Sequence, residues 1–226
     1  MKKGFVKIIS IAVLAGILTS AVLTGCNDSS TQTSTTAATS TESSAEAPKK
    51  DTYDPTPLDP DKVYFADIDI KDYGKIIIKL DQKSAPITCA NFVALAEMGF
   101  YDGLTFHRIM EGFMMQGGNA EGTDKEGIAQ TIKGEFSANG VDNPLLHTRG
   151  AVSMARTSLS MDSASSQFFI VHKTSPHLDG QYACFGYVTD GMSVVDKICE
   201  EAEPTDDNGT IEKDKQPVIN SIRIRT

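Results

Sequence analysis

Residues 106–119 read FHRIMEGFMMQGGN, and this stretch decides how the rest of the chain is interpreted. Two short apolar runs flank a Glu-Gly pair, a pattern that predicts two strands joined by a tight turn. Arg108 is the only arginine or lysine in the stretch. Met114 and Gln116 are two residues apart and therefore share one face of the second strand. Phe113 reaches that face only if a turn or bulge at the Glu-Gly pair rotates the chain.

Two further blocks follow along the chain. The second is SMAR at 153–156 followed by SASSQFFI at 163–170, and the third is LDGQYACFG at 178–186. In their order and approximate spacing, the three blocks resemble the cyclophilin family of peptidyl-prolyl isomerases, and together they cover most of residues 63–226. The resemblance implies a mostly β fold: a closed eight-stranded antiparallel barrel capped by two helices, with an apolar groove that binds proline-containing polypeptides. It also implies a monomer without cofactor or metal.

The resemblance assigns roles to residues by their position in the motifs. Arg108 is implied as the catalytic residue, and Arg156 and Thr157 as rim residues that contact the residue before the substrate proline. The groove is implied to be lined by Phe113, Met114, Gln116, Ala155, Gln167, Phe169 and Leu178. His177 stands where many members carry tryptophan, and Tyr182 where histidine is common, so we expect a thinner or more polar groove wall and doubtful cyclosporin binding.

The implied reaction explains why an arginine is suited to this position. Rotation about a prolyl peptide bond breaks no bond, and its barrier of about 18 to 20 kcal/mol comes from amide resonance. The twisted bond leaves a lone pair on the prolyl nitrogen, and a fixed guanidinium that hydrogen-bonds this nitrogen favours the transition state over both planar forms. Arg108 needs no proton transfer for this role. His107 is therefore predicted to be packed or hydrogen-bonded and not catalytic.

The remaining pattern is consistent with a small β protein. Alternation over 63–80 predicts a hairpin, and Ser-Ala-Pro at 84–86 predicts the start of an amphipathic helix that ends at Gly99. A second helix is predicted near 194–199. The other predicted strands are 105–109, 113–116, 151–155, 167–171, 183–188 and 218–225.

The cysteines, histidines and acidic residues show no metal-binding spacing. Cys89 and Cys184 are predicted as buried free thiols, although an exported protein could pair two of the three cysteines that follow Cys26. Residues 206–209, Asp-Asp-Asn-Gly, are interpreted as a polar turn because they lack the full ligand pattern of a calcium loop.

The amino terminus is predicted to be a lipoprotein signal peptide over residues 1–25. Three lysines precede an apolar run of 16 residues, 8–23, which is shorter than the roughly 20 that a membrane-spanning helix needs. The following Leu-Thr-Gly-Cys resembles a lipobox, so Cys26 is predicted to be lipidated and the protein to be anchored extracytoplasmically to a bacterial cell membrane. The alternatives are a plain signal peptide or a short signal anchor.

Residues 26–62 are predicted to be a disordered tether. Twelve of the 20 residues from 27 to 46 are Ser or Thr, and four prolines follow. As a flexible coil, residues 27–62 would span about 30 to 36 Å, enough to hold a domain away from a lipid surface.

Composition and charge limit the function. The chain has 226 residues, 40% hydrophobic and 23% charged, which excludes collagen, coiled coils and polytopic membrane proteins. Its formal charge is −9, or −12 without the first 25 residues, and this argues against nucleic-acid partners. The sequence therefore favours a membrane-anchored isomerase that accelerates folding of exported proteins. The alternative is a proline-peptide-binding chaperone or assembly module with little turnover, whereas a two-lobed solute-binding protein would need a longer chain.

Overall fold

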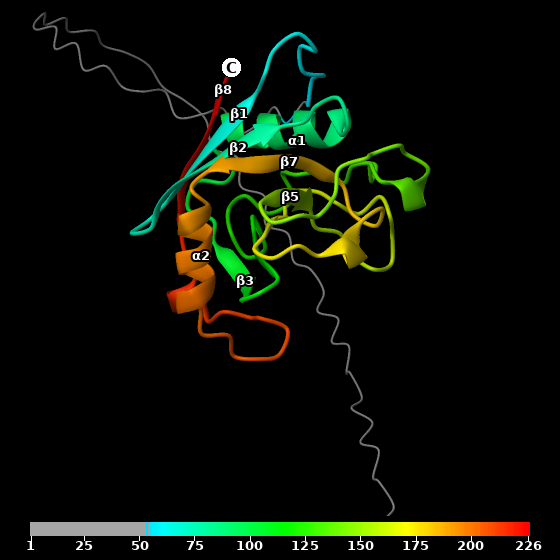
Figure 1. Ribbon diagram of the computed structural model, residues 1–226. Coiled ribbons are helices and arrows are strands. Elements are labelled where there is room, and N and C mark those ends of the chain that lie inside the picture. The colour runs from blue at the N-terminus through cyan, green and yellow to red at the C-terminus, as the bar shows by residue number, and fades with distance from the viewer. Residues whose placement is uncertain (1–52, 54) are drawn as a thin grey trace, which may run out of the picture. The chain divides into compact units, whose positions relative to one another are not determined.

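The computed structural model describes Tyr53 and residues 55–226, and its main feature is one curled antiparallel sheet (Figure 1). The strands are β1 (Phe65–Ile70), β2 (Gly74–Leu80), β3 (Phe106–Met110), β4 (Met114–Gly117), β5 (Ala151–Met154), β6 (Phe168–Val171), β7 (Cys184–Asp190) and β8 (Ile219–Arg225). Their order across the sheet is β3-β4-β6-β5-β7-β2-β1-β8. The predicted mostly β, eight-stranded antiparallel architecture with two helices is confirmed.

The segment just before edge strand β3 meets the start of the other edge strand, β8, through backbone hydrogen bonds. Ile219 N donates to Leu104 O and Gly103 N to Ile219 O, each at 2.8 Å. Thr105 also forms an antiparallel bridge with Val218. The sheet therefore curls until the ends of its first and last strands come together, with the larger hydrophobic core on its inner face.

The predicted helices are α1 (Pro86–Glu97) and α2 (Met192–Glu201), which are well separated from each other in Figure 1. Helix α1 was predicted to be amphipathic, and this was wrong, because most of its circumference is buried, including the polar Thr88 and Asn91. The polar groups have partners: Asn91 Nδ2 donates to Ser165 O at 2.7 Å. Loop residues Glu135 and Ser165 bind the polar side of α1, which the sequence pattern predicted to face solvent.

Helix α1 begins at a proline and has no capping side chain of its own. Its first N–H groups are bound instead by Glu135, which is 2% exposed. The two carboxylate oxygens accept hydrogen bonds from Ile87 N at 3.0 Å and Thr88 N at 2.8 Å. A negative charge at a helix amino terminus is favourable, so a residue 47 or 48 positions away supplies the cap.

Alternation along the strands separates two hydrophobic clusters. Met115, Phe168 and Ile170 belong to the large inner core, together with residues of both helices. Their neighbours Met114 and Phe169 belong to a smaller cluster on the opposite face of the sheet. We call this the outer cluster; its buried members are Met114, Ala151, Phe169, Val171, Leu178 and Cys184.

The residues before β1 contact the folded unit. Tyr53 and Leu58 pack against the inner core, and Gln82 Nε2 donates to the carbonyls of Asp59 at 2.8 Å and Lys62 at 2.9 Å. The packed part of the chain thus extends on the amino-terminal side of the boundary predicted at residue 63. The predicted signal peptide, Cys26 and most of the predicted tether lie outside the described residues. Within 55–226, no helix is both long and apolar enough to cross a membrane.

Replacing Glu135 with alanine tests the remote cap of α1. The Glu135→Ala variant leaves buried N–H donors without a partner, so we expect the free energy of unfolding to fall by about 2 to 4 kcal/mol. Urea denaturation monitored by circular dichroism measures this loss. Glu97→Ala, at an exposed position of the same helix, is the control and should change stability little. Equal stability of both variants would contradict the assigned cap.

Candidate active site

A groove lies over the outer cluster and contains Arg108. Its cavity has a volume of about 120 Å³. It is lined by Arg108, Phe113, Met114, Gln116, Ala155, Arg156, Phe169, Leu178 and Tyr182. The structure therefore brings residues of all three sequence blocks to one concavity, although they are separated by up to 74 positions in the chain. The floor is apolar, since Met114, Phe169 and Leu178 are almost fully buried.

Strand pairing places the polar side chains of the groove. Arg108 on β3 is the register partner of Gln116 on β4, and Gln116 is in turn the partner of Phe169 on β6. Arg108 Nη1 donates to Gln116 Oε1 at 3.3 Å, and Gln116 Nε2 donates to Gln167 Oε1 at 2.8 Å. Two glutamines thus connect the guanidinium to the strand that carries Phe169.

The guanidinium of Arg108 is held on a second side as well. Its Nε donates to the backbone carbonyl of Asn208 at 2.7 Å. Its Nη2 lies 3.3 Å from the sulfur of Met110. Within residues 55–226, no carboxylate forms an ion pair with Arg108, so none there neutralises its charge. The site therefore offers a positioned positive charge beside an apolar floor.

Phe113 reaches the groove by way of the turn that the alternation argument required. Strand β3 ends at Met110, Gly112 takes a positive φ of 74°, and Phe113 N donates to Met110 O at 3.0 Å. The change of chain direction at Gly112 lets Phe113 line the groove together with Met114. The ring of His177 packs against Phe113 with centroids 5.5 Å apart.

A second arginine of the groove lining, Arg156, is held by its own set of contacts. Its carbon Cζ lies 4.9 Å from the centroid of the Tyr182 ring and 5.3 Å from that of Phe136. Its Nε donates to Gln181 O and its Nη1 to Thr157 O, both at 3.0 Å. Two aromatic rings and two carbonyls therefore fix this second guanidinium at the rim.

Three of the predicted site residues lie beside the groove and do not line its cavity. Gln167 lines the neighbouring hollow of about 180 Å³ while its amide oxygen binds Gln116. His177 contacts the groove through Phe113. Thr157 is exposed, and its backbone N–H and hydroxyl both bond to Ser163 Oγ.

Three polar side chains behind the groove, of which His147 and Ser153 are buried and Asp179 is partly exposed, form a hydrogen-bonded row that no sequence pattern indicated. Asp179 Oδ1 accepts a hydrogen bond from His147 N at 2.7 Å and lies 2.9 Å from His147 Nδ1. His147 Nε2 lies 2.8 Å from the hydroxyl of Ser153. The imidazole is stacked against the ring of Phe169, with centroids 6.1 Å apart and an 18° angle. The row thus supports the groove floor from below.

The hydrogen-bonded side chains of Ser153, His147 and Asp179 do not act as a hydrolytic triad. Ser153 is 0% exposed, so a substrate carbonyl cannot reach its hydroxyl. Burial lowers the pKa of His147 despite the neighbouring carboxylate. A neutral ring with its proton on Nδ1 donates to Asp179 and accepts from Ser153, so both ring nitrogens of His147 have a partner.

Burial also shifts the pKa of His107, beside Arg108, and of the described cysteines toward the neutral form. Burial, followed by the charge of Arg108, lowers the pKa of His107. The three described cysteines, Cys89, Cys184 and Cys199, are free and buried, as predicted for the first two. Burial raises the pKa of Cys199 to about 12 and that of Cys89 and Cys184 above the usual range, so none is an activated thiolate.

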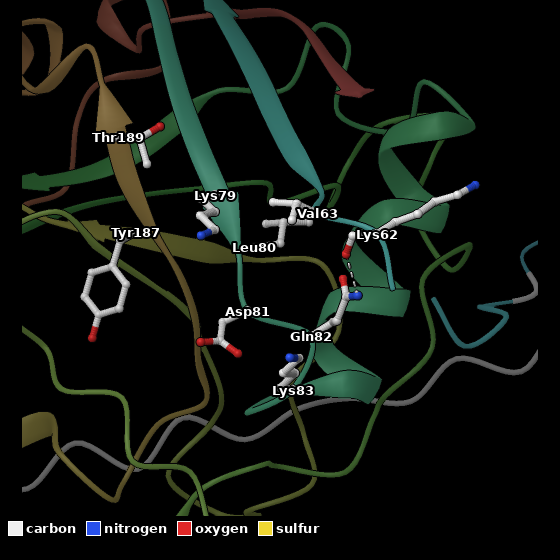
Figure 2. A pocket seen from close by; sticks show the side chains of 9 residues that line it. All are labelled: Lys62, Val63, Lys79, Leu80, Asp81, Gln82, Lys83, Tyr187 and Thr189. Atoms are coloured by element: carbon white, nitrogen blue, oxygen red, sulfur yellow. Dashed lines mark hydrogen bonds between the residues drawn. The ribbon is translucent and has the colours of Figure 1, made fainter. Parts of the chain in front are cut away.

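A second, larger cavity of about 360 Å³ lies away from the groove (Figure 2). Its lining consists of Lys62, Val63, Lys79, Leu80, Asp81, Gln82, Lys83, Tyr187 and Thr189. Figure 2 shows the amide of Gln82 directed at the Lys62 carbonyl, the contact that fastens the segment before β1. Asp81 accepts a hydrogen bond from Ser84 N at 3.0 Å, just before α1. Gln82 and Asp81 therefore use their side chains to hold the backbone of neighbouring segments.

Comparisons with known proteins agree with this geometry. Residues 65–225 match the family model described as cyclophilin type peptidyl-prolyl cis-trans isomerase/CLD. The chain belongs to the cyclophilin family of peptidyl-prolyl cis-trans isomerases. It therefore has peptidyl-prolyl cis-trans isomerase activity, with proline-containing peptides as substrates.

Individual relatives show the extent of the similarity. The chain is 48% identical over 123 residues to the peptidyl-prolyl cis-trans isomerase B of Bacillus subtilis, covering 54% of this chain and 82% of the relative. It is 44% identical over 161 residues to an isomerase of Acinetobacter baylyi, covering 68% and 81%. A crystal structure of a cyclophilin-type isomerase from Cryptosporidium parvum, determined in the presence of the dipeptide Ala-Pro, matches with a TM-score of 0.61 at 30% identity, covering 72% of this chain and 99% of that one.

The neutral state of His147 can be measured directly. We expect a proton–nitrogen NMR titration, assigned with a His147→Gln variant, to give a pKa below the ordinary value of about 6.5. Because the folded state disfavours the charged ring, stability is complete above pH 6.5 and decreases as the pH falls through the lower folded-state pKa. Urea unfolding at pH 7 and pH 5.5 should show this decrease. A pKa above 6.5 would instead indicate a charged ring paired with Asp179.

Proposed function

We propose that Arg108 is the catalytic residue of this isomerase. Its guanidinium would donate a hydrogen bond to the prolyl nitrogen as the bond twists and that nitrogen gains a lone pair. The observation that supports this role is a guanidinium held between Gln116 and the Asn208 carbonyl, beside an apolar floor and without an ion-pair partner among the described residues. Arginine remains charged at any working pH, so the role needs no titrating partner.

The apolar floor supplies the other half of the mechanism. Phe113, Met114, Phe169 and Leu178 would hold the proline ring while the chain on the other side of the bond rotates. Gln116 can bind substrate backbone while it also orients Arg108. Arg156 and Thr157 would meet the residue before the proline at the rim, and His177 and Tyr182 would complete the wall.

We further propose that the enzyme acts on exported proteins while anchored as a monomer to the extracytoplasmic face of a bacterial cell membrane. Support comes from the lysine-led apolar run, the lipobox-like sequence ending at Cys26 and the Ser/Thr-rich residues that follow. Uncatalysed prolyl isomerisation takes tens of seconds and limits folding wherever a chain emerges. A tethered isomerase would act on such chains as they leave the membrane.

The catalytic role of Arg108 can be tested with a short Xaa-Pro peptide. We expect Arg108→Ala to lower kcat/KM by about 100-fold or more, because the interaction made in the transition state is lost. Arg108→Lys should be nearly as slow, since a lysine lacks the planar donor geometry. An NMR-exchange assay on the 50–226 fragment measures these rates.

The control for this test is Arg149→Ala, which removes a surface arginine that does not line the groove. It should keep the wild-type rate. If the wild type and Arg108→Ala are equally slow, with peptide still bound, the protein acts as a proline-peptide-binding module and not as an enzyme. If both are equally fast, another residue is catalytic.

Lipidation can be tested by metabolic labelling with a clickable fatty acid in a bacterial host. The wild-type chain should carry the label in the membrane fraction, and Cys26→Ser should carry none, because a hydroxyl is not the acceptor in lipoprotein maturation. Ser30→Ala, four residues further on, should be labelled like the wild type. Equal labelling of Cys26→Ser and wild type would overturn the proposed anchor site.

A further inference from the structure

The turn at residues 205–210 packs directly against the strand that carries Arg108. Ile109 N donates to Gly209 O at 2.8 Å, and Ile211 N donates to His107 O at 3.0 Å. Arg108 and Thr210 form an isolated antiparallel bridge. The turn is therefore attached by backbone hydrogen bonds to the residues immediately before and after Arg108.

The same turn supplies the partner of the Arg108 side chain. The carbonyl of Asn208 accepts the Nε–H at 2.7 Å, the shortest of the contacts made by this guanidinium. Because Nε lies between Cδ and the charged carbon, this bond restricts rotation about the last side-chain torsions. The bond to Gln116, at 3.3 Å, then restrains the far end. Together they limit the guanidinium to one orientation.

Asp206 holds the turn in the shape that presents this carbonyl. Its Oδ1 accepts hydrogen bonds from Asn208 N at 3.0 Å and Thr210 N at 2.9 Å, and its Oδ2 accepts the Thr210 hydroxyl at 2.9 Å. Gly209 N donates to the Asp206 carbonyl at 3.1 Å. Thr205 N also donates to Thr210 O at 2.8 Å, but the Asp206 carboxylate binds the N–H groups on both sides of the Asn208–Gly209 peptide and so orients the Asn208 carbonyl.

Gly209 allows the turn to approach β3 closely enough. Its φ is +86°, which side chains rarely tolerate. A Cβ there would lie 2.4 Å from Met110 Cγ and 2.8 Å from the Ile109 carbonyl oxygen. Only a glycine at position 209 lets the turn approach β3 this closely, and this approach brings the Asn208 carbonyl to Arg108.

We propose that Asp206, through the Asn208 carbonyl, is a positioning residue for the catalytic guanidinium. The inference rests on the proposed role of Arg108. A guanidinium held in advance reaches the prolyl nitrogen without first losing rotational freedom, and small misplacements of such a group cost large factors in rate. Loss of Asp206 should therefore lower kcat more than it changes KM, because the ring-binding floor is left intact.

Asp207 provides a matched control. It is adjacent, exposed and equally charged, and it makes no side-chain hydrogen bond with the described residues. We expect Asp206→Ala to lower kcat about 10-fold with KM within about twofold of wild type. Asp207→Ala should keep the wild-type values, and Asp206→Asn, which retains Oδ1, should recover most of the loss. The rates are measured by NMR exchange on the full chain without its first 25 residues, using one Xaa-Pro peptide.

A spectroscopic measurement tests the Nε–H bond of Arg108 in the folded wild type, separately from activity. In the wild type, the Nε–H of Arg108, assigned by its loss in Arg108→Lys, should exchange with solvent at least 10-fold more slowly than that of Arg149, whose Nε has no described acceptor. Asp206→Ala should abolish this protection. Unprotected Nε–H in the wild type, or equal kcat for Asp206→Ala and Asp207→Ala, would overturn the proposal. Full activity of Arg108→Ala would instead overturn the proposed catalytic residue.

Discussion

The functional face of this protein depends on side-chain alternation in one pair of strands, β4 and β6. Met115 and Ile170 are register partners and both enter the inner core, so the adjacent partners Gln116 and Phe169 must face outward. A slip of one residue would expose the core side chains and bury the glutamine, and burial of the core therefore fixes the register. Burial of the inner core, which stabilises the sheet, therefore also places the side chains that form the floor of the groove.

On this floor, the chemistry is electrostatic and needs little beyond a well-placed charge. Prolyl isomerisation involves no leaving group and no proton transfer, which fits a site where burial lowers the pKa of His107 and His147 and raises the pKa of the described thiols. The hydrogen-bonded row from Asp179 through His147 to Ser153 supports the ring of Phe169 without taking part in bond chemistry. In the proposed mechanism, rigidity around the groove lets a single guanidinium distinguish a twisted bond from a planar one.

Arg108 is oriented by segments from distant parts of the chain. Gln116 comes from the neighbouring strand, while the Asn208 carbonyl comes from a turn that follows α2, 100 residues later. The closing of the sheet brings these segments together, because β8 follows that turn and returns to meet β3. Closure of the fold and orientation of the arginine are thus parts of one arrangement.

The sequence by itself determined the strands, both helices, the family and the residue types of the groove, because apolar alternation, glycine turns and closely spaced motifs are local properties of the chain. It also required the turn that brings Phe113 round. Only the tertiary structure decided that α1 is covered on nearly every side, that Glu135 caps it, and that residues 206–209 lie against Arg108. These partners are 47 to 100 residues apart. The spacing of residues within one segment does not indicate which distant segment will contact it.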